Sequence, residues 1–417
     1  MHKPTAIETL YIDFDAFFAN VEKQLDPALR HKPVGITALA SEHSVLITCC
    51  YDAKAAGIKR GMRVIEAREI CPHIIIRQAR PDVYVDVHNQ ILAEINRYVP
   101  VAKVWSIDEA ECRLIGSERQ NAKALALRIR EGLAANVGSY ITPSIGLGPN
   151  QFLAKVAAEM NKPNGLTLLH PDILPGPLLG LSLTDLPGIS GNMETRLHAA
   201  GVTTVWDLWN ISAKHARKIW GNVEGERLWS QLRGYAVERP PTQKRMFGHS
   251  RVLSGEFKDP ARAIDCLHLL TVKAAFRLRR AGFLAGSLSI SLRTNEAPRW
   301  HGSRNFAPVA DDFTFVRHMR ALYDEGLSAL GRPRRLKSTS IMLHGLSRPQ
   351  DLAYDMFARH DQSVKQETFD RLMGVIDGLN MKHGRALLHV GARAKLPGGY
   401  AGAKIAFGRV PVKEDFY

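Results

Sequence analysis

Residues 8–25 read ETLYIDFDAFFANVEKQL and combine two structural signals. The first half is an apolar-rich run with strand character, and the second half places Phe17, Val21 and Leu25 at helical spacing. Two carboxylates, Asp13 and Asp15, lie at the end of the predicted strand. A strand that leads directly into a helix and ends in acidic residues predicts an α/β domain whose sheet carries carboxylates at its edge.

A second acidic pair lies in VAKVWSIDEAECRLI, residues 101–115, which reads as two strands meeting at a turn that contains Asp108 and Glu109. The surrounding pattern continues the alternation of strands and helices: helices are expected over 81–99, 122–137 and 150–160, and a strand over 141–148. Residues 45–72 read as a strand followed by helical pieces that Gly57 and Gly61 interrupt, which predicts a small inserted subdomain.

The two acidic clusters together favour a metal site. Positions 13 and 15 face the same side of a strand, and a neighbouring strand can bring Asp108 and Glu109 to the same place. Either cluster alone is weak, because carboxylates at strand ends are usually just solvated. Both, however, are embedded in apolar strand residues, where grouped carboxylates are costly unless cations neutralise them. Two divalent ions about 3.5–4 Å apart can drive phosphoryl or nucleotidyl transfer, and Mg2+ prefers such hard oxygen ligands.

The rest of the chain predicts further modules. From residue 183 to about 235 the pattern is helical with Gly-containing turns, and ERPPTQKRM, residues 238–246, has the composition of a linker. Beyond it, strand-like segments and helical segments alternate as in an α+β module; the strands are expected at 250–257, 287–295 and 337–346, and the helices at 263–282 and 315–330. The last stretch holds one helix, 367–384, and a tail that is expected to be loosely ordered.

Charge points to a polyanionic partner. The 417 residues carry a net charge of +15, and residues 247–345 hold 16 Lys and Arg against 8 Asp and Glu, more than half of the excess. A gathered excess predicts a nucleic-acid footprint, whereas a merely solvated surface would spread it. The five cysteines show no CxxC spacing, no apolar stretch reaches the ~18 residues of a membrane span, and the N-terminus lacks a signal-peptide layout. We therefore expect a cytoplasmic protein without a membrane partner.

Five ordered stretches resemble one family. They are YIDFDAFFANVE, TCCYDAKAAGIKRGM, SIDEAE, SIGLGPNQFLAKVAAEMNKPNG and LPGISGNMETRLHAAGVTTVWDL, and they span about residues 8–235. They resemble the Y-family DNA polymerases, in particular the bacterial branch that includes DNA polymerase IV and the catalytic subunit of polymerase V. The resemblance implies a right-hand polymerase fold built from α/β and α+β domains. The implied division is palm 1–19 and 76–166, fingers 20–75, helical thumb 167–236, linker 237–246, little finger 247–345 and C-terminal tail 346–417.

The resemblance also implies roles at the active site. Asp13, Asp108 and the backbone carbonyl of Phe14 would ligate two Mg2+ ions, or Mn2+ in their place, and Glu109 would complete the site beside the primer 3′-hydroxyl. Asp15 would be supporting. Phe18 matches the steric gate that excludes a ribose 2′-hydroxyl, although by spacing alone it reads as a core aromatic. The implied nucleotide contacts are Phe18, Thr48, Tyr51, Lys54 and Lys162.

Two positions depart from the family pattern. Lys54 stands where Arg is usual, so the charge survives but bidentate geometry is lost. Gln151 stands where many relatives carry Lys, which implies an altered phosphate or backbone contact.

Further residues are expected to contact DNA or a partner. LPGISGNMETRLHAAGV looks like a helix-hairpin-helix element, whose Gly188 and Gly191 would offer backbone N–H groups to a phosphate, although a tight helical hairpin without ligand has the same pattern. In the basic module, the expected contacts to the template backbone are Arg251, Arg293 and Lys337. The segment AYDMF has the character of a sliding-clamp-binding peptide through Tyr354, Met356 and Phe357, yet it lacks the usual leading Gln and reads equally as a connection.

These expectations together describe a template-directed DNA polymerase of low fidelity that acts in translesion synthesis. It would add dNTPs to the 3′-end of primed DNA without proofreading, and the sliding clamp is a possible partner. The main alternative is a catalytically inactive relative that serves as a DNA- or clamp-binding adaptor; its signature would be loss of a metal carboxylate, and all three positions are filled. A nucleotide cyclase would also use two metals on an acidic sheet edge, but it would not explain the helical hairpin or the basic module. A non-enzymatic basic binding protein would leave the carboxylates unaccounted for.

Overall fold

The computed structural model describes residues 2–39, 41–239, 242–296, 298–351, 360–383, 387–391 and 410. Two compact units divide the chain, one formed by residues 1–240 and the other by residues 241–404. The expected clamp-binding residues Tyr354, Met356 and Phe357 lie outside the described residues. No helix of the described ranges is both long enough and apolar enough to cross a membrane.

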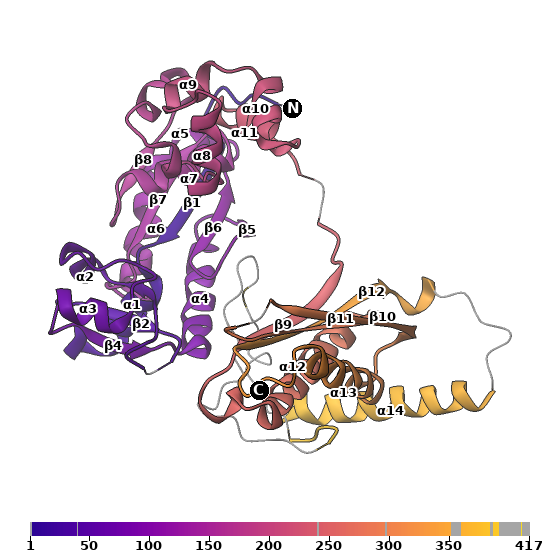
Figure 1. Cartoon of the computed structure of the whole chain (residues 1–417). Helices are drawn as coiled ribbons and strands as arrows, with labels where there is room; N and C mark the ends of the chain where they lie inside the picture. Colours follow the sequence, from indigo (N-terminus) through magenta and orange to yellow (C-terminus); the bar gives the residue numbers. More distant parts are fainter. Residues whose placement is uncertain are drawn as a thin grey trace. The chain divides into compact units, whose positions relative to one another are not determined.

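A five-stranded sheet forms the centre of the first unit (Figure 1), in the order β5-β6-β1-β7-β8. Its strands are β1 (Thr9–Phe14), β5 (Val101–Val104), β6 (Glu109–Arg113), β7 (Pro143–Gly148) and β8 (Leu166–Leu168). Strand β1 pairs antiparallel with both β6 and β7. All six residues of β1 are buried, and helix α1 (Phe17–Leu25) follows it directly, which confirms the strand-to-helix pattern of the opening sequence.

Helix α7 (Gln151–Met160) packs closely on β1 and β7. Tyr11 of β1 clusters with Ala154 and Ala158 of α7, so the face of β1 that carries Tyr11 and, two residues on, Asp13 is the face turned toward this helix. Two glycines of β7 permit the approach: a Cβ on Gly146 would overlap the carbonyl oxygen of Ala154, and one on Gly148 would lie 2.7 Å from the amide nitrogen of Ala154. The helices α4 (Pro81–Ile95) and α6 (Ala122–Asn136) contact each other, and the short α5 (Ser117–Gln120) precedes α6.

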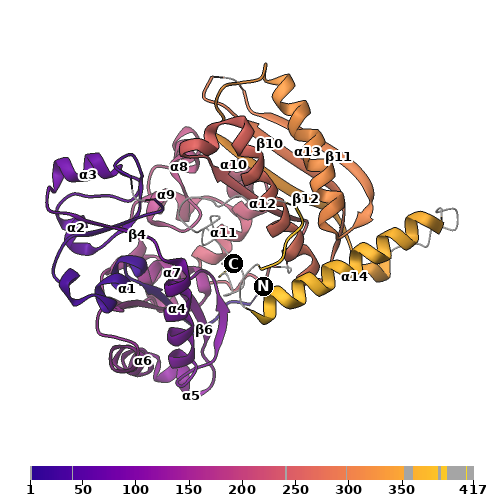
Figure 2. The same ribbon diagram turned by 90° about the horizontal axis from the view of Figure 1, so that it is seen from below.

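A smaller three-stranded sheet forms a group of its own within this unit, as both views show (Figures 1 and 2). It consists of β2 (Val34–Thr37), β3 (Leu46–Cys49) and β4 (Ile75–Gln78), accompanied by α2 (Tyr51–Ala55) and α3 (Val64–Ile70). Its separate core includes Val34, Ile36, Leu46 and Ile58. The predicted strand and helical pieces of residues 45–72 are confirmed. Strands β2 and β4 were not expected.

The third part of the first unit is helical, as predicted. It contains α8 (Gly191–Ala199), α9 (Val205–Asn210), α10 (Ala213–Trp220) and α11 (Glu224–Leu232). Its core joins Leu197, Leu208 and Leu232 to Phe152 and Leu153 of α7, so α7 belongs to two packing layers at once. Short 3-10 helices precede it at Pro171–Ile173, Gly176–Leu178 and Leu183–Asp185.

The second unit is a four-stranded antiparallel sheet in the order β11-β10-β12-β9. Its elements are β9 (Met246–Val252), α12 (Pro260–Arg280), β10 (Leu284–Arg293), β11 (Trp300–Val309), α13 (Asp312–Ala329), β12 (Ser338–Ser347) and α14 (His360–Lys382). Helices α12 and α13 lie along one face of the sheet (Figure 1). The predicted helices and the strands at 287–295 and 337–346 are confirmed. The strand expected at 250–257 is shifted: β9 ends at Val252, and Gly255–Lys258 forms a 3-10 helix. Strand β11 was missed because it carries few apolar residues and only its last residue is fully buried, so its sequence lacks the alternation that marks a strand.

Helix α14 is anchored by a buried arginine. The Arg279 guanidinium of α12 forms a bidentate pair with Asp377 of α14, at 2.7 and 2.9 Å, and a third bond of 2.6 Å to Asp312 of α13. The rings of Phe313 and Phe369 stack at 4.5 Å and add an apolar contact between α13 and α14. A planar guanidinium with its donors satisfied in this way fixes the three helices relative to one another.

Because α7 packs so closely on β7, we predict that one methyl group added at Gly146 destabilises the fold. We expect Gly146→Ala to lower the free energy of unfolding by about 2 kcal/mol or more, because the added Cβ overlaps helix backbone that cannot rotate away. Gly180→Ala is the matched control, since a Cβ there meets nothing within 4 Å. Thermal unfolding measures both, and an unchanged midpoint for Gly146→Ala would contradict the packing described.

Candidate active site

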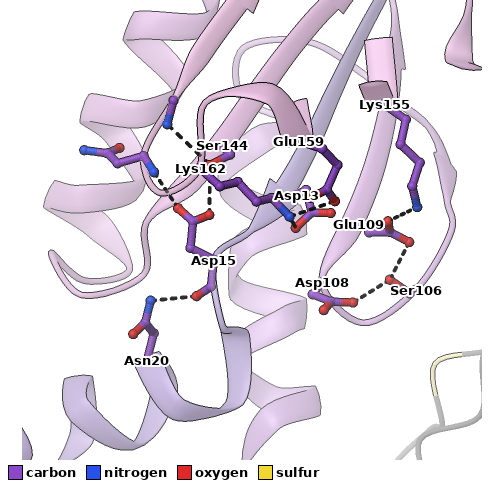
Figure 3. A network of polar contacts seen from close by, with 12 residues as sticks. Asp13, Asp15, Asn20, Ser106, Asp108, Glu109, Ser144, Lys155, Glu159 and Lys162 are labelled. Carbon is purple, nitrogen blue, oxygen red and sulfur yellow. Dashed lines mark hydrogen bonds and ion pairs between the residues drawn. The ribbon is translucent and has the colours of Figure 1, made fainter. Parts of the chain in front are cut away.

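Three carboxylates converge from two paired strands. Asp13 on β1 is the register partner of Glu109, the first residue of β6. Asp108 immediately precedes β6, and its backbone carbonyl accepts a hydrogen bond of 2.9 Å from the amide of Phe14. Antiparallel pairing therefore brings together the two acidic clusters that the sequence separates by almost a hundred residues (Figure 3).

Lysines and a serine hold these carboxylates. The Lys162 ammonium lies 2.5 Å from Asp13 Oδ1 and 2.9 Å from Glu159 Oε1. Lys155 of α7 pairs with Glu109 Oε1. Between the two acidic residues of the turn, the Ser106 hydroxyl lies 2.5 Å from Asp108 Oδ1 and 3.1 Å from Glu109 Oε2 (Figure 3).

Burial sets the electrostatics of the cluster. It raises the pKa of Asp13 well above its ordinary value although Lys162 acts in the opposite direction. Burial also raises the pKa of Asp108, whose hydrogen bond from Ser106 lowers it and whose neighbour Glu109 raises it further. Burial opposes the charge of Lys162, but Asp13 and Glu159 together raise the pKa of its ammonium. The site thus carries negative charge that the protein alone only partly compensates.

The donor set suits Mg2+. Asp13, Asp108 and Glu109 provide hard carboxylate oxygens beside the main chain of Phe14, which is the chemistry that Mg2+ takes from proteins. Within the described ranges, no group of three or more His, Cys, Asp and Glu side chains is already arranged as a ligand sphere. In this structure Lys162 and Lys155 pair with oxygens of Asp13 and Glu109.

Asp15 serves a different purpose from Asp13. It lies beyond the end of β1, where its carboxylate accepts hydrogen bonds of 2.8 Å from the Ser144 hydroxyl and 2.7 Å from the amide of Asn164. Asn20 donates to its backbone carbonyl at 2.6 Å. Asp15 therefore ties the loop that carries Lys162 to the sheet, in keeping with the expected supporting role.

Three of the expected nucleotide contacts lie on the smaller sheet and its helices. Thr48 is part of β3, and Tyr51 and Lys54 lie on α2, with the Lys54 ammonium 3.9 Å from the centre of the Tyr51 ring. Burial raises the pKa of Tyr51 to about 12, and charges that include Asp15 and Lys162 also act on it. Tyr51 is therefore electrostatically coupled to the carboxylate cluster.

Phe18 stacks on a fixed partner. Its ring lies 4.6 Å from the ring of Tyr84 at an interplanar angle of 15°. The Tyr84 hydroxyl donates to Glu22 at 2.9 Å, and Arg80 forms two further bonds to the same carboxylate. This support holds the Phe18 ring in one orientation.

The expected DNA contacts differ in their surroundings. Gly188 has a φ of +92°, a left-handed conformation that favours glycine, and Gly191 is the first residue of α8. Arg293 and Lys337 are exposed at the end of the second unit's sheet, where the amide of Lys337 donates to the carbonyl of Arg293 at 2.6 Å.

Arg251 is less accessible than Arg293 and Lys337. Its register partner on the neighbouring strand β12 is Thr339, which is buried. The Nη1 atom of Arg251 is also buried and has no hydrogen-bond partner. Its charge lowers the pKa of the Cys266 thiol of α12, which burial raises. Alternation along β9 thus turns Arg251 toward α12 rather than toward the open face of the sheet.

Sequence reasoning missed Ser106, Ser144 and Lys155. A serine before an acidic pair and a lysine within a helix are common, and only the pairing of β1 with β6 and β7, and of α7 with the sheet, brings them to the carboxylates.

Family models match three stretches of the chain. The impB/mucB/samB family matches residues 12–159, the thumb domain of DNA polymerase-iota matches 184–235, and the impB/mucB/samB family C-terminal domain matches 244–355. Together they cover most of the central sheet, the helical module and the sheet of the second unit.

Comparisons that extend over most of the chain indicate the same family as these models. The DNA polymerase IV of Moorella thermoacetica is 32% identical over 397 residues, which is 91% of this chain and 94% of the relative. The DNA polymerase IV of Legionella pneumophila (strain Philadelphia 1) is 29% identical over 341 residues, 80% of this chain and 94% of the relative. Among solved structures, a Y-family DNA polymerase chimera, Dbh-Dpo4(243-245)-Dbh, has the same fold with a TM-score of 0.69 at 22% identity, covering 82% of this chain and 99% of that one.

The fold joins a palm and fingers to a thumb and a C-terminal little finger, and the matches extend over most of the length of both chains. The protein belongs to the Y family of translesion DNA polymerases, a family that is generally metal-dependent, and is similar to DNA polymerase IV.

Proposed function

We propose that this chain extends a DNA primer along a template by two-metal nucleotidyl transfer at Asp13, Asp108 and Glu109. The observation that supports this most directly is the convergence of the three carboxylates on paired strands, Asp13 opposite Glu109 with Asp108 beside them. Two Mg2+ ions, when bound, would lower the pKa of the attacking 3′-hydroxyl and neutralise the leaving pyrophosphate. Asp13, Asp108 and the Phe14 carbonyl would hold them, and Glu109 would face the primer end.

The nucleotide would lie between the carboxylates and α2. Tyr51, Lys54 and Lys162 supply a hydroxyl and two ammonium groups, which suit a triphosphate because they offset its charge. Lys54 offers a point charge without the fork of an arginine, so this contact orients the phosphates less strictly. Thr48 stays a predicted contact on β3, and Phe18 would lie against the sugar as a steric gate, a role supported by its fixed stacking on Tyr84.

Primed DNA is the proposed macromolecular substrate. We assign the palm to 1–19 and 76–166, the fingers to 20–75, the thumb to 167–236 and the little finger to 247–345. Backbone amides near Gly188 and Gly191 would contact phosphates, and the exposed Arg293 and Lys337 would contact the template backbone. Arg251 is a weaker candidate because its side chain is turned toward α12.

Other parts of the proposal rest on the family. Low fidelity, the lack of proofreading and a clamp contact through residues 354–357 remain predictions. A reducing cytoplasmic setting is supported by the five cysteines, all free and buried. No observation favours the inactive adaptor, because all three carboxylates are present and converge.

Primer extension tests the activity. Purified protein with Mg2+ and dNTPs should extend a primed template, and the Asp108→Ala, Glu109→Ala variant should lose about a thousandfold or more in rate because it cannot hold the metals. Retained binding of the variant to primed DNA, measured by fluorescence anisotropy, controls for folding. Wild-type protein that binds DNA but extends no primer with any divalent metal would overturn the proposal in favour of the adaptor.

Sugar selection tests Phe18. We expect Phe18→Ala to raise incorporation of ribonucleotides relative to deoxyribonucleotides by about tenfold or more, because the ring would no longer exclude the 2′-hydroxyl. The ratio of kcat/KM for a matched rNTP and dNTP pair on one template measures this. Tyr84→Phe is the control that keeps both rings, and unaltered sugar selection in Phe18→Ala would contradict the role.

The raised pKa of Asp108 predicts a gain in stability when its charge is removed. A carboxyl group with a raised pKa in the folded state stabilises the fold below its ordinary pKa and loses this contribution as pH rises through the folded-state pKa. In metal-free buffer at pH 8, Asp108→Asn should therefore raise the midpoint of thermal unfolding by about 2–4 °C. The gain should shrink as the pH falls toward about 4, the ordinary pKa of an aspartate, because protonation of the wild-type carboxyl removes the same charge. Asp324→Asn, at an exposed position, is the control. If the midpoint of thermal unfolding of Asp108→Asn at pH 8 equals that of wild type, the electrostatic explanation is wrong.

A further inference from the structure

Lys155 is the lysine of the carboxylate network that lies within the central helix α7. Its ammonium pairs with Glu109 Oε1, and both side chains are largely buried, with 25% and 17% of their surfaces exposed. Neither the sequence pattern nor the proposed roles of the nucleotide contacts uses this residue. The roles proposed so far therefore do not explain why a buried lysine lies beside Glu109.

The backbone that carries Lys155 has little freedom to move. The flanking Ala154 lies against Gly146 and Gly148 of β7, so closely that neither glycine can accept a Cβ without displacement. Asn150 caps the start of the helix by accepting from the amide of Leu153 at 2.8 Å, and its side chain donates to the carbonyls of Gln231 and Tyr235 at 2.8 and 3.0 Å. The helix is thus fastened at its start and along its length.

Glu109 has a fixed cation beside it. Lys155 engages Oε1, and the Ser106 hydroxyl lies 3.1 Å from Oε2 but 2.5 Å from Asp108 Oδ1, so its single proton can go to either carboxylate. The two neighbours come from different elements, the helix α7 and the turn before β6 (Figure 3). A carboxylate paired with an ammonium on a rigid helix keeps one orientation, whereas a carboxylate on a free side chain samples several rotamers.

The other lysine of the network differs from Lys155. Lys162 lies beyond the end of α7, and it divides its ammonium between Asp13 and Glu159. Such a cation can leave Asp13 and still keep Glu159 as a partner, which suits its proposed contact with a triphosphate. Lys155 forms a direct ion pair with Glu109 and, from farther away, its charge also acts on Glu159.

We propose that Lys155 is a positioning residue that fixes the Glu109 carboxylate and neutralises its charge before metal binds. The inference rests on the proposed role of Glu109 beside the primer end. Lys155 then has two opposite effects. It holds Glu109 in the orientation needed for the reaction, and as a resident cation it weakens the attraction of the free site for a divalent ion.

Direct binding of Mn2+ separates these effects from a merely structural role. In the absence of DNA and nucleotide, Lys155→Met should bind Mn2+ about threefold to tenfold more tightly than wild type, measured by electron paramagnetic resonance of the free ion, because a competing positive charge is gone.

In primer extension the same variant should lose about tenfold or more in kcat with little change in the KM for dNTP, since Glu109 is no longer oriented. Lys155→Arg should restore most of both properties.

The controls make each outcome decisive. Lys123→Met, at an exposed position of α6, should match wild type in both assays. If Lys155→Met is unfolded at the assay temperature, Lys155→Gln, which keeps a hydrogen-bond donor, replaces it with the same expectations. Unchanged or weaker Mn2+ affinity, or an unchanged kcat, overturns the role of Lys155 when wild type is active. An inactive wild-type protein would instead count against the proposed polymerase function itself.

Discussion

The close packing of helix α7 on strands β1 and β7 is the constraint on which the rest of the first unit depends. Gly146 and Gly148 remove the side chains that would hold helix and sheet apart, and Ala154 fills the space. The same helix supplies Phe152 and Leu153 to the core of the helical module. One rigid element therefore connects the catalytic sheet to the thumb, and any shift of the helix would alter both at once.

The carboxylate cluster is stable only because cations share its space. Asp13 and Glu109 face each other across β1 and β6, and burial of Asp13 and Asp108 makes their negative charge costly. Lys162 and Lys155 offset that cost from the side of α7. In the proposed reaction, divalent metals would take over part of this compensation. Activity and stability therefore place opposite demands on the same side chains.

The second unit has a hydrophobic core of its own. Helices α12 and α13 cover one face of its sheet, and Arg279 is buried between Asp312 and Asp377, which attaches α14 to both helices. Family models for the C-terminal domain end at residue 355, before this helix begins. This helix beyond the matched domain is held by the charge network of Arg279 together with the stacking of Phe313 on Phe369.

The sequence by itself determined the family, the strand and helix that frame Asp13, and the acidic turn at Asp108 and Glu109, because these signals are local: a run of apolar residues and a carboxylate beside it are read within a few positions. It also predicted the helical module and most elements of the second unit. Short or polar strands such as β2, β4 and β11 escaped, since their pairing depends on neighbours distant in the chain. Only the tertiary structure decided that Lys155 meets Glu109 and that Arg251 turns toward α12. Contacts between elements depend on the register and close packing of whole strands and helices, which no single stretch of residues encodes.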